Sequence, residues 1–320
     1  GCSYTDPLYK TVIGASDTTQ SGRIVFPAPQ QGMPVSIAAL PSHLEGAHIT
    51  LFGPADTKKG AINAMRSFFR ETPGEGGVLK NLVEQFPWKP KWGADDEDSR
   101  TPLNVTFSEG MGILQGCYKH YLTMTDKSGK LYHITPDSSE AFRYATPIKR
   151  PPGIAIPDTG HVYNGNPLPL HLYDICMHLF LNKDNPEALS FYIPKLETVE
   201  EAGYIKTLIE TSERALHELD ENYKVGQVRL FVVFENPRAM CQIEDIINVL
   251  YPYFAGGSLG WHDYLASVAR LNRFDPNYRI PVKSNPNIVR EHIKESHLKI
   301  ADIVGRNGGV AIGGMYGVLP

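Results

Sequence analysis

Short apolar runs alternate along the chain with longer segments in which apolar residues return every three or four positions. The short runs are typical of buried strands, and the longer segments are typical of amphipathic helices. The expected strands cover residues 48–53, 91–94, 145–150, 189–196, 228–235, 279–282 and 308–314, with a further apolar run from 254. The expected helices cover residues 59–69, 110–118, 171–181, 198–219, 242–251 and 287–304. Thr198 with Glu201 predicts a capping box at the start of the helix 198–219. This alternation predicts a parallel α/β fold, and we expect a (β/α)8 TIM barrel rather than an open sheet.

The barrel is expected to span residues 48–320, because the patterns before it and within it change character. Residues 1–47 are rich in proline and glycine, which predicts an irregular N-terminal extension with one short hairpin at most. Glycines interrupt residues 71–90, which we interpret as an insertion with a short helix at 78–86. Residues 122–133 favour a hairpin. The 320 residues are enough for one barrel of about 250 residues with extensions.

Composition excludes several classes of protein. Hydrophobic residues make up 42% and charged residues 21% of the chain, and the formal net charge is -4, as in an ordinary globular protein. No basic block favours nucleic acid as a partner, and no apolar run reaches the ~18 residues of a membrane-spanning helix. The four cysteines are dispersed, which fits reduced thiols in the cytoplasm.

Two acidic residues stand at the ends of predicted strands. Glu235 closes the apolar run 228–235, and Asp263 follows the apolar run that begins at 254. In a barrel the carboxyl ends of the strands gather at the active site, and two acids there can hold Mg²⁺. For either acid taken alone, capping of a helix is the alternative. A glycine-rich turn at residues 256–260 favours a ligand site, because glycine lets backbone N–H groups approach closely.

Other charged residues follow strands in the same way. Arg150 is either a surface arginine or a fixed cation that neutralises an oxyanion. The acids at 95–98 form either a solvated loop or a cluster with at least one member in the site. Lys195 and Glu197 favour a structural salt bridge. The histidines and cysteines form no zinc pattern, and the glycines form no phosphate-binding loop.

Several short elements, in order, resemble the malate synthase family. The matching elements are Gly53-Pro54-Ala55-Asp56 with Ile62-Asn63-Ala64, Ala94-Asp95-Asp96-Glu97-Asp98-Ser99, Arg150-Pro151-Pro152-Gly153, Tyr192-Ile193-Pro194-Lys195-Leu196-Glu197-Thr198, Phe234-Glu235, Gly260-Trp261-His262-Asp263-Tyr264 and Ala311-Ile312-Gly313-Gly314-Met315. The related malyl-CoA and citryl-CoA lyases share the barrel and some of these elements.

The resemblance implies a metal and two substrates. Glu235 and Asp263 would bind Mg²⁺, and the ion would chelate glyoxylate or another 2-oxo acid. Backbone N–H groups from Gly260 through Trp261 and His262 to Asp263 would hold the carboxylate of that acid.

The remaining roles concern the second substrate. Arg150 would stabilise the enolate of acetyl-CoA, or of another acyl-CoA, and Glu97 would lie beside the metal through water. The implied reaction is a condensation that gives malate, in the cytoplasm or, in a eukaryote, the peroxisome.

The sequence also departs from the family. Pro152 stands where the family has an arginine, and no match is found for the C-terminal helical domain that supplies the catalytic base. The chain is then either part of a longer protein, or dependent on another subunit for the base, or changed in activity. A lyase of the malyl-CoA or citryl-CoA type and a non-catalytic barrel that binds a metal or an oxo acid are the alternatives, and a homo-oligomer is left open.

Overall fold

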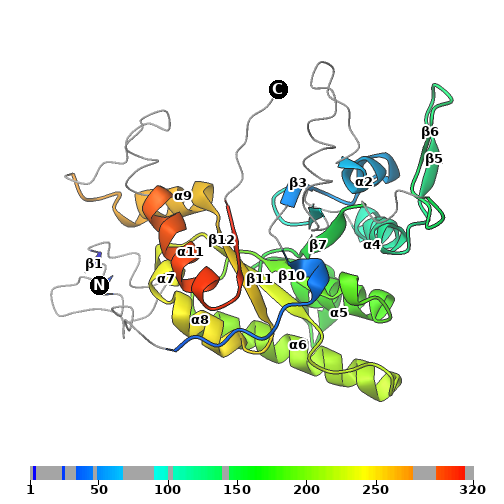
Figure 1. Cartoon of the computed structure of the whole chain (residues 1–320). Coiled ribbons are helices and arrows are strands. Elements are labelled where there is room, and N and C mark those ends of the chain that lie inside the picture. Colours follow the sequence, from blue (N-terminus) through cyan, green and yellow to red (C-terminus); the bar gives the residue numbers. More distant parts are fainter. Residues whose placement is uncertain are drawn as a thin grey trace. The chain divides into compact units, whose positions relative to one another are not determined.

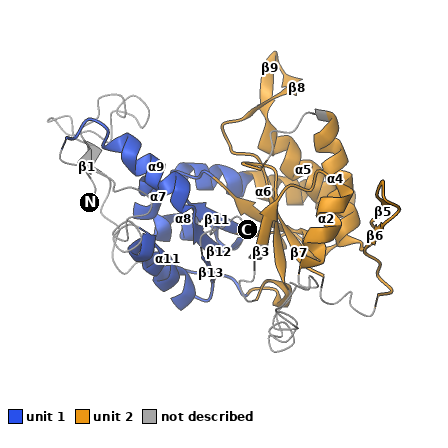
Figure 2. Ribbon diagram, turned by 90° about the horizontal axis from the view of Figure 1, so that it is seen from above, with its two compact units in different colours: residues 1–39, 195–207, 231–320 blue, residues 40–194, 208–230 orange. Residues whose placement is uncertain are grey.

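The computed structural model describes residues 3–4, 24–25, 34–45, 49–67, 90–99, 104–138, 144–276 and 293–313. The chain divides into two compact units (Figure 2). The first unit contains residues 1–39, 195–207 and 231–320, and the second contains residues 40–194 and 208–230. The predicted strand at 279–282 and nearly all of the predicted insertion at 71–90 lie outside the described residues.

Four strands of the second unit lie side by side in the order β10-β7-β4-β3 (Figure 1). They are β3 (Ile49–Gly53), β4 (Lys91–Asp95), β7 (Thr146–Arg150) and β10 (Ser190–Ile193). Each neighbouring pair is parallel, and the register of β4 and β7 sets Asp95 opposite Arg150. The Trp92 indole N–H donates to the Gly53 carbonyl at 3.1 Å and so ties β3 to β4. The ends of β4 and β7 therefore present their polar residues together.

Helices of the second unit supply the apolar side chains that bury these strands. The helices are α2 (Lys58–Met65), α4 (Asn104–Tyr118) and α5 (Leu170–Asn182), with the short 3-10 helices Ser42–Leu44 and Pro186–Ala188. One apolar cluster joins Ile62 and Met65 of α2, Trp92 of β4 and Leu114 of α4, all of them buried. Burial of such side chains contributes about 1.5–3 kcal/mol each, so the cluster holds the strand ends in place.

Two hairpins extend from the second unit. The predicted hairpin is confirmed as β5 (Thr123–Thr125) with β6 (Leu131–His133). A second one, β8 (Pro157–Tyr163) with β9 (Asn166–Pro169), was not predicted. Its two-residue turn is Asn164-Gly165, with φ values of 49° and 78°. Asn-Gly is the strongest short signal of a hairpin, because both positions need a left-handed backbone.

The first unit contains the strands that precede the two acids. They are β11 (Arg229–Phe234, whose first two residues belong to the second unit), β12 (Phe254–Leu259) and β13 (Val310–Ile312), in the order β13-β12-β11. Its helices are α7 (Pro237–Cys241), α8 (Ile243–Leu250), α9 (Trp261–Leu271) and α11 (Glu295–Arg306), and a small antiparallel pair joins β1 (Ser3–Tyr4) to β2 (Ile24–Val25). The helix α6 (Val199–Leu219) begins in this unit and ends in the other.

The prediction of a glycine-rich turn at residues 256–260 is wrong, because residues 256–259 belong to the strand β12. A Cβ on Gly256 would lie 2.3 Å from the Val310 carbonyl oxygen, and one on Gly257 would lie 2.7 Å from the Phe234 ring. These glycines let β12 pack closely against its neighbours. Among the described residues, no helix is long and apolar enough to cross a membrane.

Candidate active site

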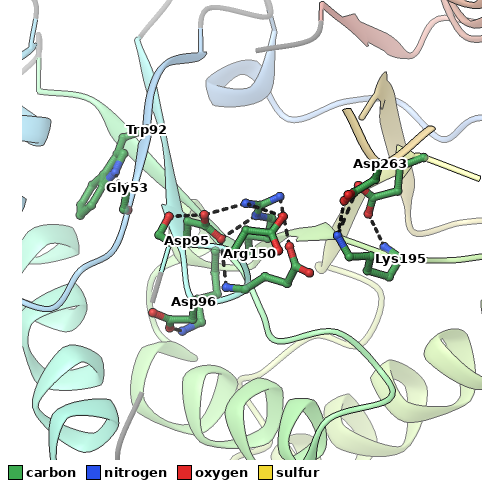
Figure 3. Close-up of polar contacts among 12 residues, drawn as sticks. Gly53, Trp92, Asp95, Asp96, Arg150, Lys195 and Asp263 are labelled. Carbon is green, nitrogen blue, oxygen red and sulfur yellow. Dashed lines mark hydrogen bonds and ion pairs between the residues drawn. The ribbon is translucent and has the colours of Figure 1, made fainter. Parts of the chain in front are cut away.

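Arg150 is held by the carboxylate of Asp95. Its Nε donates to Asp95 Oδ1 and its Nη2 donates to Asp95 Oδ2, each at 2.6 Å (Figure 3). The Ser99 hydroxyl donates to Oδ2, and the Glu97 N–H donates to Oδ1 at 3.0 Å. Burial raises the pKa of Asp95, but the contacts with Arg150 outweigh burial and hold that pKa below its usual value. The carboxylate therefore stays ionised and fixes the guanidinium in one orientation.

The acidic cluster at 95–98 divides around this pair. Glu97 Oε2 lies 3.4 Å from Arg150 Nη1, and Asp98 Oδ2 lies 3.9 Å from Arg150 Nη2. The Glu97 side chain is 5% exposed, whereas that of Asp98 is 56% exposed, so the cluster is not simply a solvated loop. Burial lowers the pKa of Arg150, but Asp95 and then Glu97 and Asp98 raise it well above its usual value. Arg150 is a permanent cation with a side chain only 13% exposed.

The neighbouring Lys149 is anchored by a second pair of carboxylates. Its ammonium lies 2.9 Å from Asp174 Oδ1 and also contacts Asp96 Oδ2. Burial lowers the pKa of Lys149, yet the charges of Asp174 and Asp96 raise it above its usual value. Lys149 and Asp174 are both buried, so the pair fixes the strand that carries Arg150.

Glu235 and Asp263 come together around Lys195. Glu235 follows β11 directly and is buried, and Asp263 lies in the first turn of α9, directly after β12. The backbone N–H of Lys195 donates to Glu235 Oε1 at 2.6 Å. The Lys195 ammonium contacts Asp263 Oδ2 and lies 3.8 Å from Glu235 Oε2 (Figure 3). The two carboxylates therefore share one cation.

The charge of Glu235 depends strongly on its surroundings. The pKa of Glu235 is raised to about 8, mainly by burial, and the charge and hydrogen bond of Asp263 also raise it. The Lys195 charge and its backbone N–H oppose this increase. A buried carboxyl group next to a second carboxylate is stabilised as an anion by any cation that approaches both.

Gly260 leaves the space that Glu235 occupies. A Cβ at this position would lie 2.6 Å from Glu235 Oε2, 2.7 Å from Glu235 Cβ and 2.9 Å from Val233 Cγ1. The Gly260 N–H donates to the Phe234 carbonyl at 3.1 Å, which joins the start of α9 to the end of β11. The rings of Trp261 and His262, the first two residues of α9, are stacked with centroids 3.6 Å apart. Any side chain at 260 would displace the carboxylate.

The donors around Lys195 suit a hard divalent cation. Mg²⁺ binds oxygen ligands and commonly takes only one or two protein carboxylates, with water and substrate oxygens completing its shell. Glu235 and Asp263 supply such a pair, and the Lys195 ammonium stands in for a cation between them. Within the described residues, no group of three or more His, Cys, Asp or Glu side chains could hold a metal.

The chain matches one known family of barrel proteins over most of the residues described above. The sequence profile described as "Malate synthase, TIM barrel domain" matches residues 146–320, which is more than half of the chain. The chain belongs to the malate synthase TIM barrel family. This finding confirms the resemblance seen in the sequence motifs and the prediction of an α/β TIM barrel fold. Arg150, Glu235 and Asp263 all lie within the family match.

Individual relatives are distant. The malate synthase of Streptomyces clavuligerus is 27% identical over 293 residues, covering 89% of this chain and 48% of the relative. Malate synthase A of Escherichia coli is 22% identical over 288 residues, covering 89% of this chain and 48% of that relative. A Haloferax volcanii malate synthase in a pyruvate/acetyl-CoA ternary complex superposes with a TM-score of 0.47 at 14% identity, over 85% of this chain and 60% of that one. The chain spans about half the length of the curated relatives it matches.

The family motif around Lys195 also contains contacts that the sequence did not predict. The expected Lys195–Glu197 salt bridge is replaced by the contacts of Lys195 with Asp263 and Glu235. The reason is the backbone of Lys195, whose φ of 58° is left-handed and uncommon for a residue other than glycine. No local pattern signals that conformation.

The start of α6 follows its prediction. The backbone N–H groups of Glu197 and Thr198 donate to Glu201 Oε2 at 2.6 and 3.2 Å, and the Glu201 N–H donates to Thr198 Oγ1 at 3.2 Å. This reciprocal arrangement confirms the capping box predicted from Thr198 and Glu201. Glu197 is therefore part of a helix start, and burial followed by the Glu201 charge raises its pKa.

Proposed function

We propose that this chain is the barrel part of a Mg²⁺-dependent enzyme that condenses acetyl-CoA with glyoxylate to give malate. The observation that carries the proposal is the convergence of the Glu235 and Asp263 carboxylates around one cation, at the ends of two strands within the family match. Relatives named malate synthase, and one of them described in a pyruvate/acetyl-CoA complex, support the substrate classes. The cytoplasmic location stays a prediction, and the peroxisome is the alternative that the glyoxysomal relative of Candida tropicalis favours.

Glu235 and Asp263 are proposed to hold the Mg²⁺ ion. When bound, the ion polarises the aldehyde of glyoxylate as a Lewis acid. The backbone N–H groups from Gly260 to Asp263 lie at the start of α9, where a helix favours an anion, and they are proposed to bind the glyoxylate carboxylate. Gly260 keeps this helix start and the Glu235 carboxylate in contact.

Arg150 is proposed to stabilise the negative oxygen that develops on the acyl group when a proton leaves its methyl carbon, and then on the new alkoxide. A guanidinium that is already oriented gives more stabilisation than one that must reorganise during the reaction. The two 2.6 Å hydrogen bonds to Asp95 provide that orientation. Glu97 Oε2 lies 3.4 Å from Arg150 Nη1 and holds the guanidinium through its third nitrogen.

The test is release of the CoA thiol from acetyl-CoA in the presence of glyoxylate and Mg²⁺. We expect activity in the wild type and its loss in Glu235→Ala and Asp263→Ala. Asp302→Ala is the matched control, because Asp302 makes an exposed helical ion pair with Arg306. The full protein is assayed, since the residue that removes the proton has no assigned position among the described residues.

Other outcomes would support other functions. Cleavage of malyl-CoA or citryl-CoA without added glyoxylate would replace the proposal with the lyase. Absence of both activities, together with Mg²⁺ binding that Glu235→Ala abolishes, would favour a non-catalytic binding protein. If Asp263→Ala kept both the Mg²⁺ affinity and the turnover of the wild type, the assignment of the metal ligands would be wrong.

A further inference from the structure

One lysine contacts both proposed metal ligands at the same time. The Lys195 ammonium contacts Asp263 Oδ2 and lies 3.8 Å from Glu235 Oε2, between two carboxylates that lie close enough to interact directly. A single positive charge beside two acidic groups favours their anionic forms. The ammonium therefore has the electrostatic function that a bound divalent cation would have.

The backbone of Lys195 and its side chain contact the acids separately. The backbone, in a left-handed conformation with φ of 58°, donates its N–H to Glu235 Oε1 at 2.6 Å. The side chain is 37% exposed, and its partner Asp263 is 42% exposed, whereas Glu235 is 5% exposed. A flexible lysine side chain at this level of exposure can turn into water, while the backbone N–H continues to orient Glu235.

We propose that the Lys195 ammonium is a built-in competitor of the metal: it contacts Glu235 and Asp263 in the metal-free protein and must leave before a divalent cation binds. This inference rests on the metal site of the proposed function and adds a determinant of its affinity. A divalent cation and an ammonium group cannot share the same carboxylate oxygens, because like charges at contact distance repel strongly. The metal affinity is therefore set by the carboxylates and lowered by Lys195.

The first experiment measures Mn²⁺ binding to the metal-free protein by calorimetric titration, with Mn²⁺ as the probe for a hard divalent cation. Lys195→Met removes the charge and keeps most of the side-chain length, and we expect about fivefold tighter binding, the effect of losing one partly exposed ion pair. Lys195→Arg keeps the charge and should give no gain. Lys183→Met is the matched control, since Lys183 pairs with Asp184 and Asp220 and should leave Mn²⁺ binding unchanged.

The second experiment needs no variant and follows the lysine itself. Limited acetylation of the wild type, read by mass spectrometry, should modify Lys195 more readily with Mn²⁺ bound than without it. The acetylation of Lys183 should stay the same in both conditions. A change at Lys195 alone would show that the ammonium leaves the carboxylates when the metal arrives.

The outcomes separate this inference from the proposed function. If Glu235→Ala abolishes Mn²⁺ binding but Lys195→Met binds Mn²⁺ no more tightly than the wild type, the competitor is refuted and the metal site stands. Acetylation of Lys195 that Mn²⁺ leaves unchanged would refute it equally. If neither the wild type nor Lys195→Met binds Mn²⁺, the metal site and the competitor both fail.

Discussion

Replacing Gly260 with alanine tests the packing on which the Glu235 site depends. Gly260 has φ of -80°, which any residue can adopt, so the backbone does not oppose the change. The opposition is steric, because the added Cβ would lie 2.7 Å from Glu235 Cβ and 2.9 Å from Val233 Cγ1. Glu235 Cβ is fixed to the backbone and cannot rotate away, and Val233 is buried. Overpacking of this kind costs about 1–3 kcal/mol in the free energy of unfolding.

Gly305→Ala is the matched control for this substitution. Gly305 lies within α11, and a Cβ there would meet no atom within 4 Å. Alanine in place of glycine inside a helix stabilises it by about 0.5–1 kcal/mol. The same chemical change should therefore destabilise the protein at one position and stabilise it at the other.

Denaturant unfolding with an unchanged m-value gives the two free energies, and calorimetry gives the Mn²⁺ affinity of each variant. We expect Gly260→Ala to bind Mn²⁺ about tenfold more weakly, because the methyl group overlaps Glu235 Oε2 and displaces it by an amount that costs about 1.4 kcal/mol. A Gly260→Ala protein with the stability and Mn²⁺ affinity of the wild type would refute the steric argument.

Three further predictions concern the second unit. Asp95→Asn should lower turnover by about tenfold or more through a misoriented Arg150, while Asp98→Asn, at an exposed position, should change it little; equal turnover in both variants would contradict the orienting role of Asp95. Lys149→Met should cost about 3–5 kcal/mol in chemical denaturation because it leaves the Asp174 carboxylate buried without its cation, and adding Asp174→Leu should recover most of that loss. Burial, followed by the charge of Lys149, lowers the pKa of His178 to about 3. The neutral His178 therefore contributes fully to the stability of the protein above pH 6.5. As the pH falls from about 6.5 toward 3, this stability is lost by up to about 1.4 kcal/mol per pH unit. His178→Phe should unfold with a shallower dependence on pH in that range, and slopes that match the wild type would contradict the prediction.

The sequence predicts those parts of the fold that depend on local patterns. The apolar run 228–235 corresponds to β11 because a strand buried on both faces has no polar positions, and the acid after it is found where that strand ends. The capping box at Thr198 is equally local. Helix bounds are less accurate: α2 ends at Met65 rather than at residue 69, and α4 begins at Asn104 rather than at 110. The helix α9 was not predicted at all.

The contacts missed from sequence depend on register and backbone conformation. Asp95 meets Arg150 because β4 and β7 pair in one specific register, and nothing in either strand alone determines that register. Lys195 reaches Asp263 because its own φ is positive, which places its side chain away from the neighbouring Glu197. Such pairs require knowledge of which segments lie side by side.

The two charged clusters differ in a way that bears on their functions. Asp95 accepts two hydrogen bonds of 2.6 Å from the guanidinium of Arg150, and its pKa lies below the usual value. Glu235 receives only a long contact of 3.8 Å from the ammonium of Lys195, and its pKa lies at about 8. The first carboxylate is therefore fully neutralised by its own cation and serves to orient it. The second keeps its proton up to about pH 8 because burial outweighs the charge and backbone N–H of Lys195, so a divalent ion that displaces the proton stabilises its anionic form far more.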